Sequence, residues 1–459
     1  MTETEIEQLI AEQRAYFATG STIPVDARIS ALRRLERAIL DHEQEIYSAL
    51  KEDLGKSAPE SYMCEVGLTL SELRYQIKHV RRWARHHKRS SSLANFPSRC
   101  FTVAEPYGVT LIMSPWNYPF MLTMEPLAGA IAAGNCCVLK PSAYSPATSA
   151  VIRRIVEAAF SEGQVAVVEG GRAENTALLD QHFDYIFFTG GTKVGRLVME
   201  KASANLTPVT LEMGGKSPCI ITSDANLKVA AARVVFGKYL NCGQTCVAPD
   251  YVLVDQSVHD TFVELLKEQI ETMFGKNPLD NPDYGKIINR KHYERIMGLI
   301  DPAKVLVGGE GREKELRIAP TIMDKVTADD AIMSEEIFGP VMPIISYTSI
   351  DEAEAFIKER PKPLALYLFT RSKALEERFL AYVPFGGGCV NDTIVHLTIP
   401  SMGFGGVGAS GMGSYHGKKS FETFSHEKSI LKKANWLDLP MRYQPYATWK
   451  DKAVRMFLR

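Results

Sequence analysis

The chain has few cysteines for its length and no long hydrophobic run. Its eight cysteines among 459 residues are scattered, and only Cys136/Cys137 and Cys242/Cys246 lie close together. No CxxC pair or histidine-rich cluster has the spacing of zinc ligands, so we expect no metal site. The longest apolar run, around residues 129–139, is too short to cross a bilayer, and the acidic first residues are unlike a signal peptide. These absences favour a cytoplasmic protein with reduced thiols.

The sequence also lacks an excess of charge of either sign. Lysine and arginine total 53 and aspartate and glutamate 54, a formal net charge of −1, so nothing attracts the chain as a whole to nucleic acid. The one basic run, residues 81–89, is interpreted as a solvated helix end or subunit contact rather than a phosphate-binding strip. The length and the ordinary hydrophobic content predict two or three structural units around large cores.

What the chain does contain is a regular alternation of short apolar strands and helices. Residues 1 to about 87 are predicted to be helical, because apolar residues recur there at helical spacing. From residue 109, strands and helices alternate, which indicates βαβ units and an α/β fold with a doubly wound parallel sheet. A second alternating set, residues 226–385, predicts a second α/β domain. The first series is expected to have strands at 109–113, 137–139, 165–168, 185–188, 208–213 and 219–221, and helices at 121–133, 145–160 and from about 194.

The run from Asn241 to Cys246 offers a catalytic thiolate. A cysteine attacks a carbonyl carbon only as the thiolate, which requires a lowered pKa. The small, polar, glycine-containing run around Cys246 predicts a turn that exposes its side chain. Glu212, which is followed closely by two glycines at 214 and 215, is a second isolated reactive group. Most cysteines are small buried residues, so this motif alone does not establish catalysis.

Several loops that follow predicted strands have the chemistry of a binding site, and parallel sheets bind ligands at the carboxyl ends of their strands. The glycine-rich turn at residues 188–196 leads into a helix, where the backbone can approach a phosphate. An ordinary tight turn without a ligand would have the same sequence pattern. Lys140 at a strand end can bind a ribose or a 2′-phosphate, or simply be solvated. Asn117, in a loop stiffened by prolines, offers an amide donor for an oxyanion or a helix cap.

A last loop, residues 334–340, combines acidic and aromatic side chains. Glu336 can accept hydrogen bonds from the hydroxyls of a ribose, and Phe338 can lie behind a flat ring. Acidic pairs such as Glu335 and Glu336 are also common as plain surface charges. Each loop is weak evidence when it is taken alone.

Together and in order, these motifs resemble the aldehyde dehydrogenase superfamily over nearly the whole chain. The form of residues 242–251 and 414–421 is similar to the class 3 branch of that family. The motifs are PWNYP, LKPS, FTGGTKVG, LEMGGKSP, GQTC and EEIFGP, followed by Phe404-Gly405-Gly406-Val407-Gly408.

The resemblance implies oxidation of aldehydes to carboxylic acids with NAD or NADP. Cys246, rather than Cys242, would form a thiohemiacetal and then a thioester, and Asn117 with the Cys246 N–H would hold the oxyanion. Glu212 would activate the water that hydrolyses the thioester. Aromatic and medium- or long-chain aliphatic aldehydes are the implied substrates. The implied cofactor-binding residues are Ser114, Pro115, Trp116, Lys140, Gly190, Gly191, Thr192, Val194, Gly195, Glu336 and Phe338.

The resemblance also implies a division of the chain and a homodimer. The ending, residues 449–459, is a possible short amphipathic helix, which is interpreted as a packed or frayed terminus rather than a membrane anchor. The implied parts are an NAD(P)-binding domain at 1–87 and 105–211, a catalytic domain at 212–410, bridging strands at 88–104 and 426–435, and a C-terminal tail at 436–459.

Two departures from the family pattern lead to hypotheses. Ala143 stands where relatives often have a glutamate that repels a 2′-phosphate, so use of both NAD and NADP is expected. Cys242 stands where a non-thiol is common; it is either a small packed residue or a partner that traps Cys246 in a disulfide.

Three alternatives remain at this stage. One is a dehydrogenase that passes the thioester to coenzyme A, against which Glu212 argues because such an enzyme needs no base for water. Another is a thiol redox protein built on Cys242 and Cys246, which the CxxxC spacing disfavours. The third is a non-catalytic relative, which the joint presence of the motif residues makes improbable.

Overall fold

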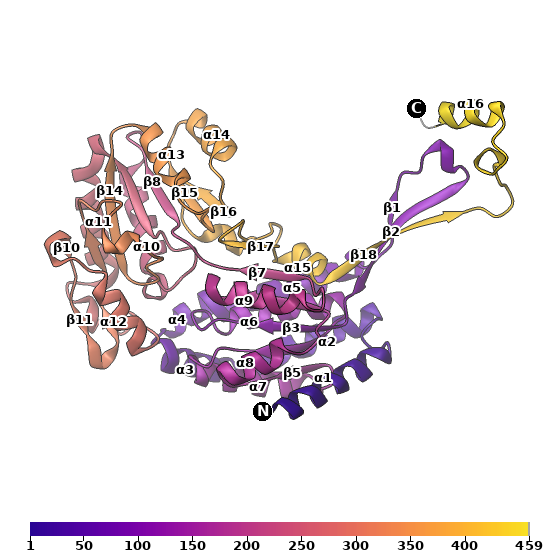
Figure 1. Cartoon of the computed structure of the whole chain (residues 1–459). Helices are drawn as coiled ribbons and strands as arrows, with labels where there is room; N and C mark the ends of the chain where they lie inside the picture. The colour runs from indigo at the N-terminus through magenta and orange to yellow at the C-terminus, as the bar shows by residue number, and fades with distance from the viewer. Residues whose placement is uncertain (458–459) are drawn as a thin grey trace.

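Two mainly parallel sheets, each covered by helices, form the body of the molecule, and an arm projects from it (Figure 1). The structure is a computed structural model and describes residues 1–457. The predicted α/β fold class is confirmed.

The first sheet has six strands in the order β17-β7-β6-β3-β4-β5, and all neighbours are parallel except β17 and β7. Strands β3, β4 and β6 are buried at every position, because helices cover both faces of the sheet. The antiparallel edge strand β17 has no sequence signal, since two residues are too few to show alternation. The strands are β3 (Val109–Met113), β4 (Cys136–Lys140), β5 (Val165–Val167), β6 (Tyr185–Thr189), β7 (Val209–Glu212) and β17 (Gly411–Met412).

Two groups of helices cover the faces of this sheet. Helices α2, α5, α6, α7 and α15 contribute to one apolar core, and α1, α8 and α9 contribute to another. Helix α6 is buried along its whole length, as expected for a helix that is apolar all round. The helices are α1 (Glu3–Ala18), α2 (Val25–Asp41), α3 (Glu43–Leu54), α4 (Ala58–Ser61), α5 (Gly67–Trp83), α6 (Met121–Ala133), α7 (Pro146–Ala159), α8 (Arg172–Leu179), α9 (Thr192–Ser203) and α15 (Gly417–Thr423).

The second sheet has seven strands in the order β10-β13-β14-β9-β8-β15-β16, with only the edge strand β10 antiparallel. Helices α10 and α11 pack together, and α12, α13 and α14 contribute to a separate core. The elements are β8 (Pro218–Ile221), β9 (Tyr251–Asp255), β10 (Val305–Val307), β13 (Thr321–Met323), β14 (Val341–Tyr347), β15 (Ala365–Phe369), β16 (Gly387–Val390), α10 (Leu227–Tyr239), α11 (His259–Phe274), α12 (Arg290–Gly298), α13 (Ile350–Lys358) and α14 (Lys373–Tyr382).

One strand lies in a different sheet from the one that the alternation of strands and helices predicts. The sequence pattern continues the first strand series through residues 219–221, but β8 pairs with β9 and β15 in the second sheet. The physical reason is the short connection at residues 213–217, because a parallel neighbour in the same sheet needs a crossover of a dozen or more residues. The chain therefore passes from one sheet to the other directly after Glu212.

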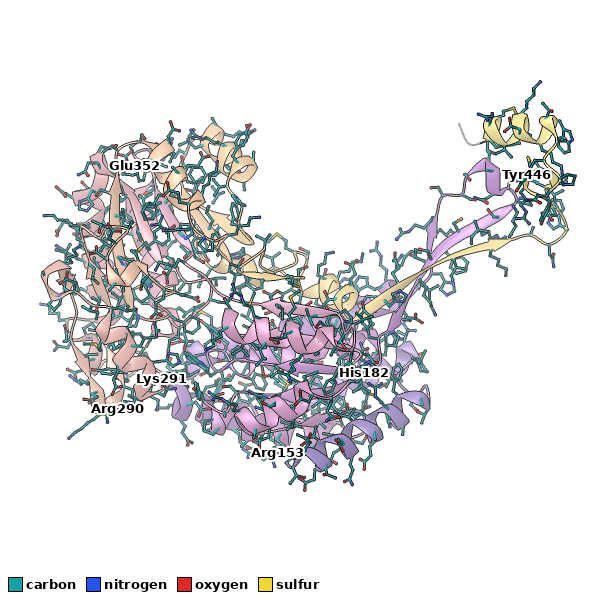
Figure 2. The ribbon with its side chains drawn as sticks, in the orientation of Figure 1. Arg153, His182, Arg290, Lys291, Glu352 and Tyr446 are labelled. Atoms are coloured by element: carbon teal, nitrogen blue, oxygen red, sulfur yellow. The ribbon has the colours of Figure 1, made fainter. Side chains whose placement is uncertain are left out.

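The arm consists of three antiparallel strands and ends in a helix (Figure 1). Strand β2 (Ser98–Pro106) lies between β1 (His87–Arg89) and β18 (Ser425–Lys433), and the bridging role of these segments stays a prediction. Helix α16 (Thr448–Phe457) buries none of its residues, and Tyr446 before it is exposed (Figure 2). Leu458 and Arg459, the end of the predicted amphipathic helix, lie outside the described residues. Within residues 1–457, no helix is both long and apolar enough to span a membrane.

Candidate active site

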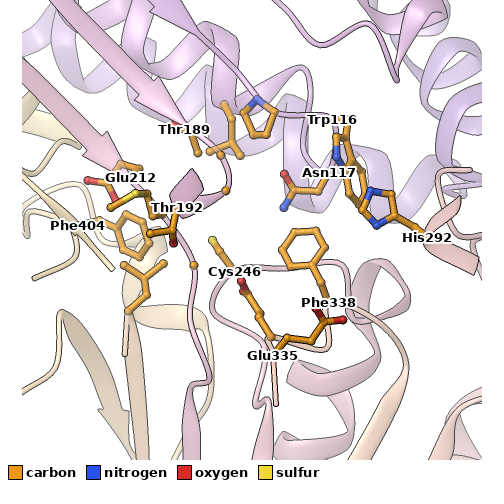
Figure 3. A pocket seen from close by; sticks show the side chains of 18 of the residues that line it. Trp116, Asn117, Thr189, Thr192, Glu212, Cys246, His292, Glu335, Phe338 and Phe404 are labelled. Atoms are coloured by element: carbon orange, nitrogen blue, oxygen red, sulfur yellow. The ribbon is translucent and has the colours of Figure 1, made fainter. Parts of the chain in front are cut away.

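Two cavities meet at Cys246. The larger has a volume of about 490 Å³ and the smaller about 160 Å³. Figure 3 shows the Cys246 side chain in the larger cavity, with Glu212 and Asn117 on opposite sides of it. Four residues line both cavities: Leu122, Cys246, Phe404 and Tyr415.

The loop before Cys246 turns sharply because three successive residues are left-handed. The φ angles of Asn241, Cys242 and Gly243 are 52°, 53° and 70°. A side chain at Gly243 would place its Cβ only 2.3 Å from the carbonyl oxygen of Gly339, so glycine is required there. The Asn241 amide stabilises the turn by donating to the carbonyl oxygens of Asn117 at 2.8 Å and Gln244 at 3.2 Å.

This turn separates the two cysteines. Cys246 is partly exposed and lines both cavities, whereas Cys242 is 3% exposed and lines neither of them as the structure describes them. Cys242 packs in the core of the second sheet, where a Cβ on Gly285 would meet its sulfur at 3.3 Å. These contacts are those of a small packed residue; a disulfide between Cys242 and Cys246 stays a prediction.

The expected lowering of the Cys246 pKa is not found. Burial raises the pKa of the thiol to about 12, and the nearby carboxyl groups of Glu336 and Glu212 raise it further, against the backbone N–H groups of Cys246 and Val247. The sequence argument was wrong on this point because it considered only the polar residues beside Cys246 and not the carboxyls that the fold brings to it.

Glu212 ends β7 and has no hydrogen-bond partner for either carboxyl oxygen within residues 1–457. Its side chain is buried, and that burial raises the pKa of the carboxyl well above its ordinary value. The carboxyl lies close to Gly405, where a Cβ would be 3.0 Å from Oε1. An unpartnered buried carboxyl that borders a cavity can hold and activate a water molecule.

Asn117 lies in the loop between β3 and α6, and its amide is anchored to the loop of Cys246. Its Nδ2 donates to the carbonyl oxygen of Gln244 at 3.0 Å, so one of its two N–H groups is used there and the second can serve a ligand in the cavity. The sequence did not reveal what holds this loop. Lys56 donates to the Asn117 carbonyl oxygen at 3.0 Å and pairs with Glu65 at 2.5 Å, and both charged side chains are 0% exposed.

Most of the predicted cofactor residues line the larger cavity. The N-terminal residue of α9, Thr192, follows Gly191, which provides no side-chain cap, so the first N–H groups of this helix are available to a phosphate. Trp116 and Phe338 face each other edge to face with centroids 5.3 Å apart. The predicted cofactor residues in this lining are Pro115, Trp116, Gly190, Gly191, Thr192, Glu336 and Phe338.

Four predicted cofactor residues do not line this cavity as described. Ser114 hydrogen-bonds the Thr123 hydroxyl at 2.6 Å, and Gly195 lies against the sulfur of Met213. Val194 is exposed. Lys140 is buried and donates to the carbonyl oxygens of Pro141 and Gly170 at 2.8 and 2.7 Å. Desolvation lowers the pKa of Lys140 to about 8. Their roles toward a cofactor stay predictions.

Sequence reasoning missed two residues of helix α12 that border the same cavity. His292 and Arg295 lie on α12, and His292 contacts Trp116 with ring centroids 5.1 Å apart. Burial lowers the pKa of His292 to about 4, so its imidazole is neutral at pH 7. A helix that faces solvent on one side and a cavity on the other gives no sequence signal that would single these residues out.

The smaller cavity is almost entirely apolar. Within the described chain its lining contains no Asp, Glu, Lys or Arg. Its walls come from segments far apart in sequence, including Met63, Leu68, Met121, Phe236, Leu240, Val395 and Leu397.

Comparisons with known proteins agree on one family. A family model described as the aldehyde dehydrogenase family matches residues 1–430. The chain is 46% identical over 456 residues to 4,4′-diaponeurosporen-aldehyde dehydrogenase of Staphylococcus aureus, and this alignment covers 99% of each chain. It is 44% identical over 444 residues to a dog enzyme named dimeric NADP-preferring aldehyde dehydrogenase, covering 96% of this chain and 98% of the relative. A solved substrate-bound structure of Staphylococcus aureus AldH is similar with a TM-score of 0.97 at 46% identity, covering 99% of both chains.

Proposed function

Because this chain belongs to the aldehyde dehydrogenase family and oxidises aldehydes with NAD or NADP, we propose that Cys246 is the nucleophile of that reaction. The observation that carries this proposal is the place of its thiol at the junction of the two cavities. An unpartnered carboxyl, Glu212, and an anchored amide donor, Asn117, border the same space.

In the first half of the reaction the Cys246 thiolate adds to the aldehyde carbon, and the carbonyl oxygen becomes an oxyanion. The free N–H of the Asn117 amide and the backbone N–H of Cys246 stabilise this oxygen as charge develops. The resulting thiohemiacetal loses a hydride from the same carbon, which leaves a thioester on Cys246. A nicotinamide cofactor, when bound, would supply the acceptor for this hydride.

The residues of the larger cavity fit such a cofactor. The uncapped N-terminus of α9 with Gly190 and Gly191 suits the pyrophosphate, because both glycines border the cavity and a Cβ at Gly190 would lie only 2.6 Å from the Phe188 ring. Glu336 and Phe338 would contact the nicotinamide ribose and ring.

In the second half Glu212 takes a proton from a water molecule, whose oxygen attacks the thioester carbon. The carbon–sulfur bond breaks, the carboxylic acid is formed, and Cys246 returns as the thiolate. The absence of any hydrogen-bond partner for the Glu212 carboxyl among residues 1–457 supports this role, because the group is free to bind the water.

The smaller cavity would bind the carbon chain of the substrate. Its apolar lining favours aromatic and medium- or long-chain aliphatic aldehydes over charged ones. One relative of this chain is named 4,4′-diaponeurosporen-aldehyde dehydrogenase, an enzyme of an aldehyde whose name carries no charged group. Coenzyme A as the acceptor remains the alternative, and the position of Glu212 favours water. A thiol redox function fits less well, because Cys242 lines neither cavity.

We also propose a homodimer in the cytoplasm. A relative that this chain matches over 98% of its length is named dimeric, and the exposed three-stranded arm is a suitable contact for a second copy. The eight cysteines are all free, as a reducing compartment would keep them.

The substitution Glu212→Gln tests the assignment of the base. We expect one equivalent of NADH or NADPH to form in a burst at the normal rate, because the first half of the reaction does not use Glu212. Steady turnover should then fall about 10²–10⁴-fold, since the thioester lacks general-base help. Steady turnover that stays at the parent rate across pH 6 to 9 would show that another group activates the water.

A further inference from the structure

One buried ion pair joins three of the segments that border the larger cavity. Lys216 follows the loop of Glu212, and Asp250 follows the loop of Cys246. Their side chains pair with Nζ 2.5 Å from Oδ2, and they are 14% and 5% exposed. Neither residue lines either cavity as described.

Both members of the pair also hold the segment that carries Glu336 and Phe338. The Lys216 ammonium donates to the carbonyl oxygens of Ile332 at 3.0 Å and Glu335 at 2.8 Å, so all three of its N–H groups are used. The second oxygen of Asp250 accepts a hydrogen bond from the N–H of Ile337 at 2.9 Å. The backbone N–H of Asp250 donates to the Ser217 carbonyl oxygen at 2.8 Å, which closes the link.

The segment held in this way is strained and closely fitted. Phe338 has a φ of 47°, an unfavourable angle for a bulky side chain, which persists only when surrounding contacts enforce it. The Glu336 carboxyl lies so close to Gly214 that a Cβ there would be 2.3 Å from both oxygens. Arg295 binds the segment from the other side, donating to the Ile337 carbonyl oxygen at 2.7 Å. Glu336 therefore has one defined position. Its carboxyl lies against Gly214, which comes two residues before Lys216 in the sequence.

We propose that Lys216 and Asp250 are positioning residues that set Glu336 and Phe338 relative to Cys246, and thereby determine cofactor affinity and the rate of hydride transfer. The inference rests on the proposed function, since it takes Glu336 and Phe338 as cofactor contacts. An ion pair suits this task because its hydrogen bonds fix direction and register, which an apolar contact of the same volume does not.

A second buried ion pair provides a matched control. Lys56 and Glu65 are likewise paired at 2.5 Å with 0% exposure, but Lys56 donates to the carbonyl oxygen of Asn117, and Glu65 accepts from the N–H of Phe120. This pair holds the oxyanion loop instead of the cofactor segment. Breaking it should therefore disturb acyl chemistry and leave cofactor affinity nearly intact.

The experiment compares Lys216→Met with Lys56→Met in three measurements. These are the Kd of NADPH by fluorescence titration, the single-turnover rate of hydride transfer, and the cofactor-free hydrolysis of 4-nitrophenyl acetate. The ester acylates a thiol without hydride transfer, so it reports on Cys246, Glu212 and the oxyanion donors alone.

We expect Lys216→Met to raise the NADPH Kd about tenfold and to slow hydride transfer about 10²-fold, because misplacement of a contact by about 1 Å has effects of this size. Ester hydrolysis should stay within about threefold of the parent. For Lys56→Met, ester hydrolysis and the single-turnover rate should both fall, because both pass through the oxyanion that Asn117 stabilises, whereas the NADPH Kd should stay within about threefold of the parent. Lys216→Arg, which keeps the charge, should recover most of the NADPH affinity. If Lys216→Met folds poorly, the double substitution Lys216→Met with Asp250→Leu removes the unpaired buried charge and is measured in the same way.

Three outcomes would overturn the proposal: equal losses in all measurements for Lys216→Met, no change in any of them, or the same rise in NADPH Kd for Lys56→Met. Equal losses would mean a merely structural pair. A wrong assignment of Cys246 as the nucleophile would give a different result. In that case the variant Cys246→Ala would still hydrolyse 4-nitrophenyl acetate.

Discussion

The two cavities that meet at Cys246 differ in size and in chemistry. The larger cavity, about 490 Å³ and called the cofactor side after its proposed ligand, is bordered by glycine backbone, by Arg295 and by the carboxyls of Glu212, Glu335 and Glu336. The smaller cavity, about 160 Å³ and called the substrate side after its proposed occupant, has no Asp, Glu, Lys or Arg in the lining that the structure describes. Cys246 is thus exposed to carboxyls on one side and to apolar side chains on the other.

This difference explains the high pKa of the thiol. The apolar side removes water from the sulfur, and the carboxyls on the cofactor side repel its negative charge. The same arrangement that suits an apolar aldehyde therefore keeps the thiol protonated in the cofactor-free protein.

The largest expected effect is the pH dependence of thiol alkylation in the cofactor-free protein. With a pKa of about 12, the thiolate fraction of Cys246 rises tenfold per pH unit, so its alkylation by iodoacetamide should accelerate about 10³-fold from pH 7 to pH 10. Labelling of Cys246 is followed by peptide mass spectrometry, with Cys246→Ala as the background. Glu336→Gln removes one repelling carboxyl and should raise the rate at pH 8. An alkylation rate that levels off below pH 8 would indicate a much lower thiol pKa and would contradict the proposed effect of the two cavities on Cys246.

Asn117→Ala is expected to give the next largest effect. Asn117 borders the larger cavity and is proposed to stabilise the substrate oxygen, so its loss should lower kcat about 10²–10³-fold, the usual cost of one oxyanion donor. NADPH affinity, measured by fluorescence titration, should change little. A large rise in NADPH Kd with a normal kcat would place the residue among the cofactor contacts instead. Asn117→Asp, which keeps the shape, should not restore activity because it presents a carboxylate where a donor is needed.

The sequence predicts the parts of this site that local patterns determine. Strands β3, β6 and β7 are short apolar runs, and Asn117, Gly190 and Glu212 stand at or just after their ends, so periodicity alone places them at one edge of a sheet. Residue chemistry offered Asn117 and the glycine-rich turn candidate roles beside plainer ones, and the family resemblance chose between them.

The rest of the site depends on contacts between distant segments. Lys56 and Glu65 lie in a helical region where charged residues are ordinarily solvated, and nothing local indicates that both are buried. The same holds for Lys216 and Asp250, which belong to recognisable motifs without a predicted role. The apolar cavity takes its walls from four separate parts of the chain. The position of β8 in the second sheet follows from the short connection at residues 213–217. Sequence periodicity predicts the strand but not the sheet to which it belongs.

Substrate chain length tests the apolar side with a smaller effect. Each buried methylene contributes about 0.8 kcal/mol, so kcat/KM should rise about fourfold per added methylene from butanal upwards until the cavity is full. Succinic semialdehyde, which has the length of butanal but ends in a carboxylate, should be a poorer substrate because the cavity offers that charge no partner. Steady-state rates with butanal, hexanal, octanal and succinic semialdehyde at saturating cofactor measure this. Equal values for all four would mean that the chain stays in solvent.

The smallest expected effect concerns cofactor choice at Ala143, which is exposed in the turn after β4. Without a carboxylate there, we expect kcat/KM for NAD and NADP to agree within about tenfold. Ala143→Glu should lower the value for NADP about tenfold by charge repulsion and leave NAD within about twofold, a modest change because solvent screens an exposed charge. Ala143→Gln is the matched control, since it adds the same bulk without charge. The Glu variant should lose its discrimination at high salt, whereas a steric effect would persist and would appear equally in Ala143→Gln. An NADP value thousands of times below NAD in the parent would show that other residues already exclude the 2′-phosphate.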